Sequence, residues 1–235
     1  MLWIAVVIGG CYMNFKCVIF DLDGTLVNTI DDIADSMNKA LSLYNFPVHT
    51  SCEYTKIVGW GIKRLAFLAL PVEEQKKDGV EELTENLAEA ATKFYAENPV
   101  IYSKPYLGIQ DVVLALKQKR VKTAVLTNKP DPVAQLVIQK LFPQDSFNIV
   151  RGDIFSLPRK PDPSLVWDML MELDVSPRET IIVGDSEIDM ETAYNANCHA
   201  LGVSWGFRPK EVLENAGAQR IIDKAEDLLP IVFGK

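Results

Sequence analysis

The sequence has few of the residues that zinc sites and disulfide frameworks need. Its 235 residues include four cysteines and two histidines, and no two cysteines are spaced as a CxxC pair. This composition disfavours a Cys/His zinc site, and a chain of this length does not need disulfides to fold. We therefore expect a protein of the reducing cytoplasm.

Long apolar runs and an excess of positive charge are also missing. Lys and Arg number 24 against 32 Asp and Glu, a net charge of −8, which disfavours a nucleic-acid binder because phosphates are held mainly by cations. The apolar run at 2–9 is too short to span a bilayer. It lacks the basic residues of a signal peptide, although Gly9-Gly10-Cys11 loosely resembles a lipoprotein cleavage site. We expect neither a nucleic-acid nor a membrane partner, and interpret residues 1–12 as an N-terminal extension.

Short apolar runs rich in β-branched residues predict buried strands, and helical patterns separate most of them. The strands are expected at 17–20, 123–126, 147–150, 180–183 and 200–203, with a possible last one at 220–222. The helices are expected at 111–120, 130–141, 163–173, 187–196 and 225–232. Continuous apolar strands alternating with helices indicate a parallel sheet covered on both faces. The predicted fold class is therefore α/β, with a Rossmann-like parallel sheet.

One connection is too long for an ordinary strand–helix–strand crossover. Roughly 100 residues separate the first strand from the next one, where a few tens suffice. Apolar residues recur at helical spacing in the intervening chain, at 33–44, 62–69 and 83–95. We therefore predict a core domain of residues 13–28 and 99–235, with a helical bundle inserted at 29–98. This bundle is called the helical insert below.

A DxDGT motif follows the first predicted strand, at residues 21–25. Ligands of open parallel sheets bind outside the carboxyl ends of the strands. Alternate residues of an extended segment point the same way, so Asp21 and Asp23 are expected to face one pocket. Two adjacent carboxylates repel unless a cation or a proton intervenes. Turn chemistry alone also accounts for Asp and Gly in such a loop, so this motif leaves both interpretations open.

A second acidic segment, Gly184-Asp185-Ser186-Glu187-Ile188-Asp189, follows the strand at 180–183. Asp185 is expected at the strand end and Asp189 in the first turn of the next helix, where capping alone also favours an acidic residue. Together the two segments place four carboxylates at strand ends. Oxygen ligands without Cys or His favour Mg²⁺ over zinc, so we predict Mg²⁺ as the cofactor.

Two further segments offer groups that bind phosphate. Thr127 and Asn128 follow the strand at 123–126 shortly before a helix, where a hydroxyl and backbone N–H groups suit a phosphate. Lys160 lies in a proline-flanked loop, where its ammonium can neutralise a phosphoryl group. Taken singly, Thr127 also fits a plain strand end and Lys160 a solvated surface charge.

The order of these four segments resembles that of the haloacid dehalogenase superfamily. DxDGT comes first, then a Thr after a strand, then Lys-Pro and finally GDxxxD, and the similarity extends from Phe15 over nearly the whole chain. The resemblance implies a Rossmann-like core. It also implies that the helical insert is what that family calls a type C1 cap.

The same resemblance implies roles for the acidic residues. Asp21 would be the nucleophile that forms an aspartyl-phosphate, and Asp23 the general acid and base. Mg²⁺ would be held by the carboxylates of Asp21 and Asp185 and by the backbone carbonyl of Asp23. Asp189 would support the metal through water or orient Lys160. The dehalogenase branch lacks an aspartate at the position of Asp23, so phosphoryl transfer is favoured over carbon–halogen chemistry.

The resemblance also implies how the phosphoryl group is held. Thr127 and Lys160 would be the phosphate-holding pair. Backbone N–H groups of Leu22, Asp23 and Asn128 are expected to assist them, because donors aimed at the phosphoryl oxygens stabilise the charge of the transition state.

The helical insert offers a clue to the substrate. Gly59 and Gly61 allow close approach of a ligand to the backbone, and Lys63 or Arg64 could pair with a substrate carboxylate. A flexible loop before a basic helix face is an equally good interpretation. Four runs resemble the phosphoglycolate phosphatases: Val58-Gly59-Trp60-Gly61, Thr127-Asn128-Lys129-Pro130, Gly184-Asp185-Ser186 and Ser204-Trp205-Gly206. Asn28 departs from the acidic residue common after DGTLV.

The expected function is therefore Mg²⁺-dependent hydrolysis of a small phosphorylated metabolite, foremost 2-phosphoglycolate, by a monomer or homodimer. A sugar-phosphate phosphatase or a pyrophosphatase would share the core and differ in contacts from the insert. A β-phosphoglucomutase-like phosphotransferase would return the phosphoryl group to a bound intermediate. A non-catalytic scaffold is disfavoured because both Asp21 and Asp23 are present.

Overall fold

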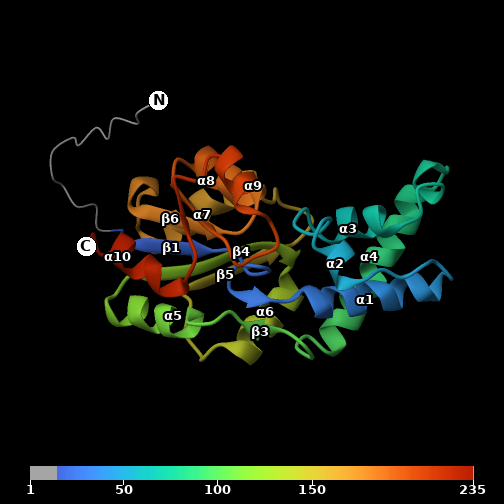
Figure 1. Cartoon of the computed structure of the whole chain (residues 1–235), viewed down its shortest axis with the longest axis horizontal. Coiled ribbons are helices and arrows are strands. Elements are labelled where there is room, and N and C mark those ends of the chain that lie inside the picture. The colour runs from blue at the N-terminus through green and yellow to red at the C-terminus, as the bar shows by residue number, and fades with distance from the viewer. Residues whose placement is uncertain (1–14, 235) are drawn as a thin grey trace.

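The computed structural model describes residues 15–234, and its centre is a six-stranded parallel sheet (Figure 1). The strand order is β5-β4-β1-β6-β7-β8. The strands are β1 (Cys17–Phe20), β4 (Lys122–Pro130), β5 (Ile149–Asp153), β6 (Thr180–Gly184), β7 (His199–Val203) and β8 (Arg220–Ile222). This architecture confirms the α/β fold class. The predicted extension at 1–12 lies outside the described residues.

Helices cover both faces of the sheet because successive residues of the central strand point to opposite sides. Val18 and Phe20 belong to one apolar core, which includes side chains of α5 (Ile109–Gln118), α6 (Asp131–Leu141) and α10 (Leu228–Val232). Cys17 and Ile19 belong to the other core, with α7 (Ser164–Leu173), α8 (Glu187–Ala196) and α9 (Lys210–Asn215). All four β1 residues are buried, which explains their continuous apolar sequence.

Two predicted elements differ from the structure at their ends. The strand expected at 123–126 continues to Pro130, with a register irregularity between Leu126 and Pro130. Thr127 and Asn128 therefore lie within β4 and not after it. The helix expected at 225–232 is a 3-10 turn, η3 (Ala225–Asp227), followed by α10.

The chain between β1 and β4 contains the helices of the insert. They are α1 (Ile30–Leu43), α2 (Ser51–Tyr54), α3 (Ile62–Ala69), the 3-10 turn η1 (Glu74–Lys76) and α4 (Val80–Glu97). The predicted apolar stripes are buried, for example at Met37 and Leu41 of α1 and at Leu87 of α4. These helices extend from the carboxyl ends of β1 and β4 (Figure 1). The domain boundaries at 29 and 98 stay a prediction.

Two short strands join the insert to the sheet domain. β2 (Val27–Asn28) pairs antiparallel with β3 (Lys104–Pro105), so the outgoing and returning chains run side by side. Beyond this ribbon, the buried carboxylate of Asp32 accepts hydrogen bonds from the backbone N–H groups of residues 101–103 and from the Ser103 hydroxyl. These two-residue strands carry no periodicity, and the sequence did not predict them.

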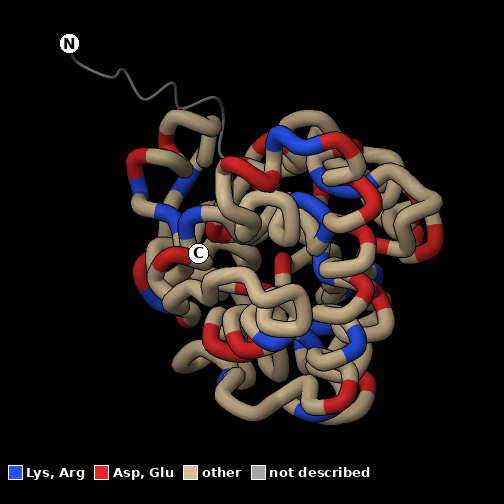
Figure 2. Tube along the Cα trace, turned by 90° about the vertical axis from the view of Figure 1, so that its right-hand side faces the viewer, with Lys and Arg blue, Asp and Glu red and all other residues tan. Residues whose placement is uncertain are grey.

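Charged residues of both signs are spread along the described chain. Figure 2 shows Lys and Arg interspersed with Asp and Glu along the chain, without one broad basic face in that view. None of the helices that the structure describes is both long enough and apolar enough to cross a membrane.

Candidate active site

Three of the four predicted carboxylates converge at the carboxyl ends of neighbouring strands. Asp21 follows β1 and Asp185 follows β6, and these strands pair in register with Phe20 opposite Val183. Asp189 lies in the first turn of α8. One oxygen from each of the three carboxylates lies within 4.8 Å of the other two, and all three residues are buried. The parallel register therefore creates an acidic cluster from segments far apart in the sequence.

The pKa values of two carboxylates in this cluster are raised by burial and by the neighbouring negative charges. Burial, with the charges of Asp189 and Asp23 adding to it, raises the pKa of Asp21 to about 7 although Lys160 opposes the shift. Burial and the neighbouring Asp21 and Asp189 raise the pKa of Asp185 to about 8. Carboxylates held this close are stabilised by a cation. Their all-oxygen donor set suits a hard divalent ion, so the cluster fits a cation site.

Lys160 supplies the one lysine ammonium that contacts the cluster in the described part of the chain. Its Nζ atom lies 2.7 Å from Asp21 Oδ1 and 2.6 Å from Asp189 Oδ1, and its side chain is 4% exposed. Burial opposes the charged form of Lys160, but the carboxylates of Asp189 and Asp21 outweigh it and raise its pKa. Lys160 is therefore a permanent cation at the cluster.

Local structure fixes the orientation of Asp185 and Asp189. Ser186 is the N-cap of α8, and its backbone N–H and its hydroxyl both donate to Asp189 Oδ2. The Thr25 hydroxyl and the Phe207 backbone N–H donate to the two oxygens of Asp185, at 3.0 and 2.7 Å. A Cβ atom at Gly24 or Gly206 would overlap the Asp185 side chain. Both positions therefore require glycine for Asp185 to fit.

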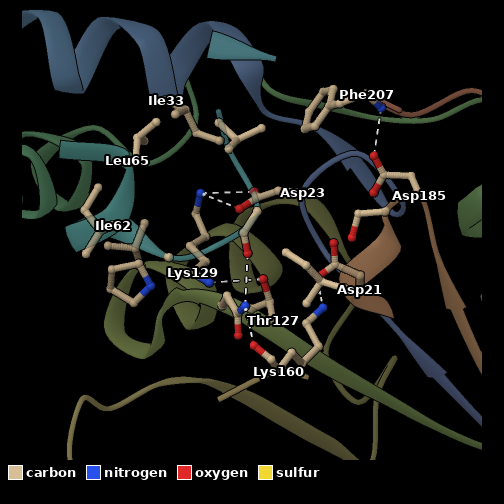
Figure 3. Close-up of a pocket in the computed structure, with 18 of the residues that line it drawn as sticks. Asp21, Asp23, Ile33, Ile62, Leu65, Thr127, Lys129, Lys160, Asp185 and Phe207 are labelled. Atoms are coloured by element: carbon tan, nitrogen blue, oxygen red, sulfur yellow. Dashed lines mark hydrogen bonds and ion pairs between the residues drawn. The ribbon is translucent and has the colours of Figure 1, made fainter. Parts of the chain in front are cut away.

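The carboxylate of Asp23 lies apart from this cluster and faces the insert (Figure 3). Its Oδ1 atom accepts a hydrogen bond of 2.7 Å from the Thr29 hydroxyl. The ammonium of Lys129 lies 3.1 and 3.3 Å from its two oxygens. Lys129 was not predicted as a site residue, although it adjoins Thr127 and Asn128 in the quoted Thr-Asn-Lys-Pro run. Its position next to Thr127 and Asn128 was the feature of the sequence that could have identified Lys129 as a site residue.

Thr127 and Asn128 lie in the same pocket as Lys160. The Thr127 hydroxyl accepts a hydrogen bond of 3.2 Å from the backbone N–H of Lys129. The Asn128 amide donates to the carbonyls of Gly59 and Lys160, at 3.0 and 3.1 Å. Asn128 therefore connects the strand end, the loop carrying Lys160 and the insert.

The pocket lies between the sheet and the insert and has a volume of about 70 Å³. Apolar side chains of the insert, including Ile33, Ile62 and Leu65, cover the polar groups of the strand ends (Figure 3). Gly59 and Gly61 line this pocket, and their contact with a substrate stays a prediction.

Lys63 and Arg64 do not belong to the pocket lining. The Lys63 ammonium lies 2.7 Å from Glu85 on the exposed face of the insert, and the Arg64 guanidinium lies over the Phe67 ring. The suggestion that either residue binds a substrate carboxylate stays a prediction that this arrangement does not favour.

A further arginine, which the sequence analysis missed, ties the insert to the core. Arg208 follows β7 and donates to the carbonyls of Thr55 and Val58 in the insert, the second at 2.7 Å. Its Nε atom lies 3.2 Å from Glu187 of α8. No spacing rule marks a single arginine in a loop, so only the folded chain identifies this contact.

Comparisons with known proteins agree with this geometry. A family model described as haloacid dehalogenase-like hydrolase matches residues 18–203. The phosphoglycolate phosphatase of Aquifex aeolicus (strain VF5) is 34% identical over 82% of this chain and 86% of its own length. That of Mannheimia succiniciproducens is 32% identical over 93% and 99%. The crystal structure of a predicted phosphoglycolate phosphatase from Haemophilus somnus superposes with a TM-score of 0.82 at 29% identity, covering 93% of this chain and 98% of that one.

Proposed function

Because the chain belongs to the haloacid dehalogenase-like hydrolase family, we propose that it is a Mg²⁺-dependent phosphatase that hydrolyses 2-phosphoglycolate through a phosphorylated Asp21. The observation that carries the proposal is the buried contact of Lys160 with both Asp21 and Asp189, next to Asp185. The carboxylates complement the charge of a divalent cation, and the ammonium complements the charge of a phosphoryl group.

The residues present fit Mg²⁺. Asp21 and Asp185 would hold it with their carboxylates, Asp23 with its backbone carbonyl, and Asp189 would support it. When bound, the ion neutralises phosphoryl oxygens and offsets the repulsion within the cluster. Burial raises the pKa values of Asp21 and Asp185 to about 7 and about 8, and a divalent cation bound there would lower both by favouring the charged carboxylates.

The first step is attack by Asp21 on phosphorus. An Oδ–P bond forms as the ester P–O bond breaks, and the protonated carboxyl of Asp23 gives its proton to the leaving alkoxide. Lys160 neutralises the transferring group, and the Thr127 hydroxyl and Asn128 backbone N–H donate to its oxygens.

The second step is hydrolysis of the aspartyl-phosphate. Asp23, now a carboxylate, takes a proton from water as the water oxygen bonds to phosphorus and the bond to Asp21 breaks. The Thr29 hydroxyl and Lys129 hold the Asp23 side chain in place for both proton transfers. The products are the alcohol and inorganic phosphate, and Asp21 and Asp23 return to their starting states.

The names of the relatives support a small substrate. The related proteins described above carry the name phosphoglycolate phosphatase. For its location we propose the cytoplasm, where the buried thiols of Cys17 and Cys198 stay reduced; burial raises the pKa of each to about 12 and keeps them unreactive.

A panel of phosphate monoesters, assayed for free phosphate with Mg²⁺ and with a chelator, tests the proposal. We expect release from 2-phosphoglycolate to exceed release from sugar phosphates and pyrophosphate, and to stop without the metal. Isomerised sugar phosphate with little free phosphate would instead identify a mutase. Turnover that is unchanged by the chelator would contradict the role of Mg²⁺.

A further inference from the structure

We propose that Lys129 of β4 and Tyr95 of α4 form a subsite that binds the carboxylate of the substrate. This inference rests on the proposed function and names the residues that would select 2-phosphoglycolate from other esters. It concerns the part of the pocket that the phosphoryl-transfer residues leave unassigned.

Lys129 is a buried cation that lines the pocket. Its side chain is 3% exposed, and within residues 15–234 Asp23 is its only ion-pair partner. The Asp23 carboxylate beside it favours the charged form, so Lys129 is an ammonium. An ammonium has three donors, and a cation with a single acidic partner in a pocket can bind a second anion.

Tyr95 brings an unpartnered hydroxyl from the insert to the same place. The Lys129 ammonium lies 3.9 Å from the centroid of the Tyr95 ring. The Tyr95 hydroxyl is buried and has no hydrogen-bond partner among the residues that the structure describes. Burial raises the pKa of Tyr95 to about 12, so the hydroxyl keeps its proton and can donate. A buried donor without an acceptor is costly, and a ligand oxygen would satisfy it.

The other cations near the pocket are already engaged. Lys160 contacts Asp21 and Asp189, and Arg208 is engaged by Glu187 and by carbonyls of the insert. Among the cations that line the pocket in the described chain, Lys129 is therefore the one that contacts a single carboxylate and no carbonyl.

The position of Asp23 fixes the class of ester. Asp23 must reach the ester oxygen to protonate it, and Lys129 lies 3.1 Å from the same carboxyl group. In 2-phosphoglycolate one methylene separates the ester oxygen from the carboxylate carbon. An ester whose oxygen faces Asp23 therefore presents a carboxylate at that separation to Lys129. Esters with the negative charge farther from the phosphate would not reach it in the same pose.

The test compares 2-phosphoglycolate with its carboxamide, which has the same shape and no carboxylate charge. The measured quantity is the ratio of kcat/KM for the acid to kcat/KM for the amide, with Mg²⁺ present. We expect Lys129→Met to lower this ratio by roughly 30-fold or more, the range for loss of a partner in a buried charge pair. Lys129→Arg should restore part of it. Tyr95→Phe, which leaves Lys129 and Asp23 intact, should lower the ratio by roughly 5-fold.

Matched variants separate this subsite from the alternatives. Lys39→Met removes an exposed lysine paired with Asp35 in the same insert and should leave the ratio unchanged. An equal fall in kcat/KM for the acid and for the amide, in both Lys129→Met and Tyr95→Phe, would overturn the proposal. The two residues would then act only through Asp23 or through the fold. A fall in the ratio in Lys63→Met or Arg64→Met, with none in Lys129→Met, would also overturn it.

Failure of the proposed function gives a different result. A parent enzyme that releases phosphate from other esters but not from 2-phosphoglycolate would contradict the substrate, and one that releases none would contradict the phosphatase itself. In either case calorimetry of Mg²⁺-loaded protein with the acid and the amide decides the subsite. Tighter binding of the acid that Lys129→Met abolishes supports it, and equal binding of acid and amide refutes it.

Discussion

The ammonium of Lys160 lies 2.7 Å from Asp21 Oδ1, although 139 residues separate the two in the chain. This contact places a permanent positive charge against the proposed nucleophile. It holds Asp21 in an orientation that the strand end alone would not fix. A phosphoryl group that bonds to Asp21 would therefore meet Lys160 at once.

Asp21→Asn should abolish turnover and preserve the fold. The amide keeps the shape of the side chain but cannot attack phosphorus, so we expect kcat to fall by at least roughly 10³-fold. Phosphate release and circular dichroism check the two halves of this prediction. Asp168→Asn, a change at an exposed carboxylate on α7, is the matched control. Parent-like turnover in Asp21→Asn would show that the nucleophile lies elsewhere.

The stability of the metal-free protein should fall as pH rises. The pKa values of Asp21 and Asp185 are raised to about 7 and about 8, whereas an exposed Asp titrates near about 4. The folded state therefore keeps protons that the unfolded chain has released, and the free energy of unfolding decreases between about pH 4 and 8.

Thermal unfolding with a chelator and with saturating Mg²⁺ measures this effect. We expect Tm of the chelated protein to decline across that pH range. The gain in Tm on adding Mg²⁺ should grow with pH, because the ion binds the deprotonated carboxylates. A gain that is the same at both ends of the range would be inconsistent with these pKa values.

Gly206→Ala should weaken the metal site directly. The new Cβ atom would overlap the Asp185 side chain, so we expect a higher Mg²⁺ concentration for half-maximal activity and a lower Tm. Gly79→Ala is the control, because no atom lies within 4 Å of its Cβ position. Gly79→Ala should lower the free energy of unfolding by about 1 kcal/mol, the cost of a side chain on a left-handed backbone. Identical Mg²⁺ requirements in the two variants would contradict the steric argument.

Asp32→Asn should destabilise the junction between insert and core. The carboxylate accepts several hydrogen bonds from residues 101–103, and an amide nitrogen in its place would face donors. We expect the free energy of unfolding to fall by about 2–4 kcal/mol, as for loss of buried bonds to a charge. Asp35→Asn, at an exposed pair with Lys39, should change it by less than about 0.5 kcal/mol. Chemical denaturation of the two variants compares these values.

Much of the core and its acidic cluster could be predicted because each depends on one local rule. The apolar run at 17–20, followed by acidic residues, predicted β1 with the ends that the structure shows. Parallel strands bring their carboxyl ends to one edge, and the pairing of β1 with β6, which was not predicted, brings Asp21 and Asp185 together there. Helix capping alone would explain an acidic residue at position 189. In the structure the capping contact with Ser186 also orients the Asp189 carboxylate.

The pocket facing the insert could not be predicted in the same way. Tyr95 falls in an apolar helical stripe and reads as a core residue, and nothing in that spacing reveals that Lys129 lies under its ring. Lys63 contacts Glu85 of α4, a pairing that depends on how the helices of the insert pack together. The contact between Lys129 and Tyr95 depends on how the insert docks on the sheet, and periodicity encodes neither arrangement.

The pairing of β2 with β3 means that the chain leaves the sheet domain and returns to it at one place. Removal of the helices between them would leave two adjacent ends that a short turn can close. The helical insert is thus attached to the sheet domain at a single place. Because Asp21, Lys160 and Asp185 all lie outside the helices between β2 and β3, a different set of helices there would change what covers the pocket and leave these residues in the sheet domain.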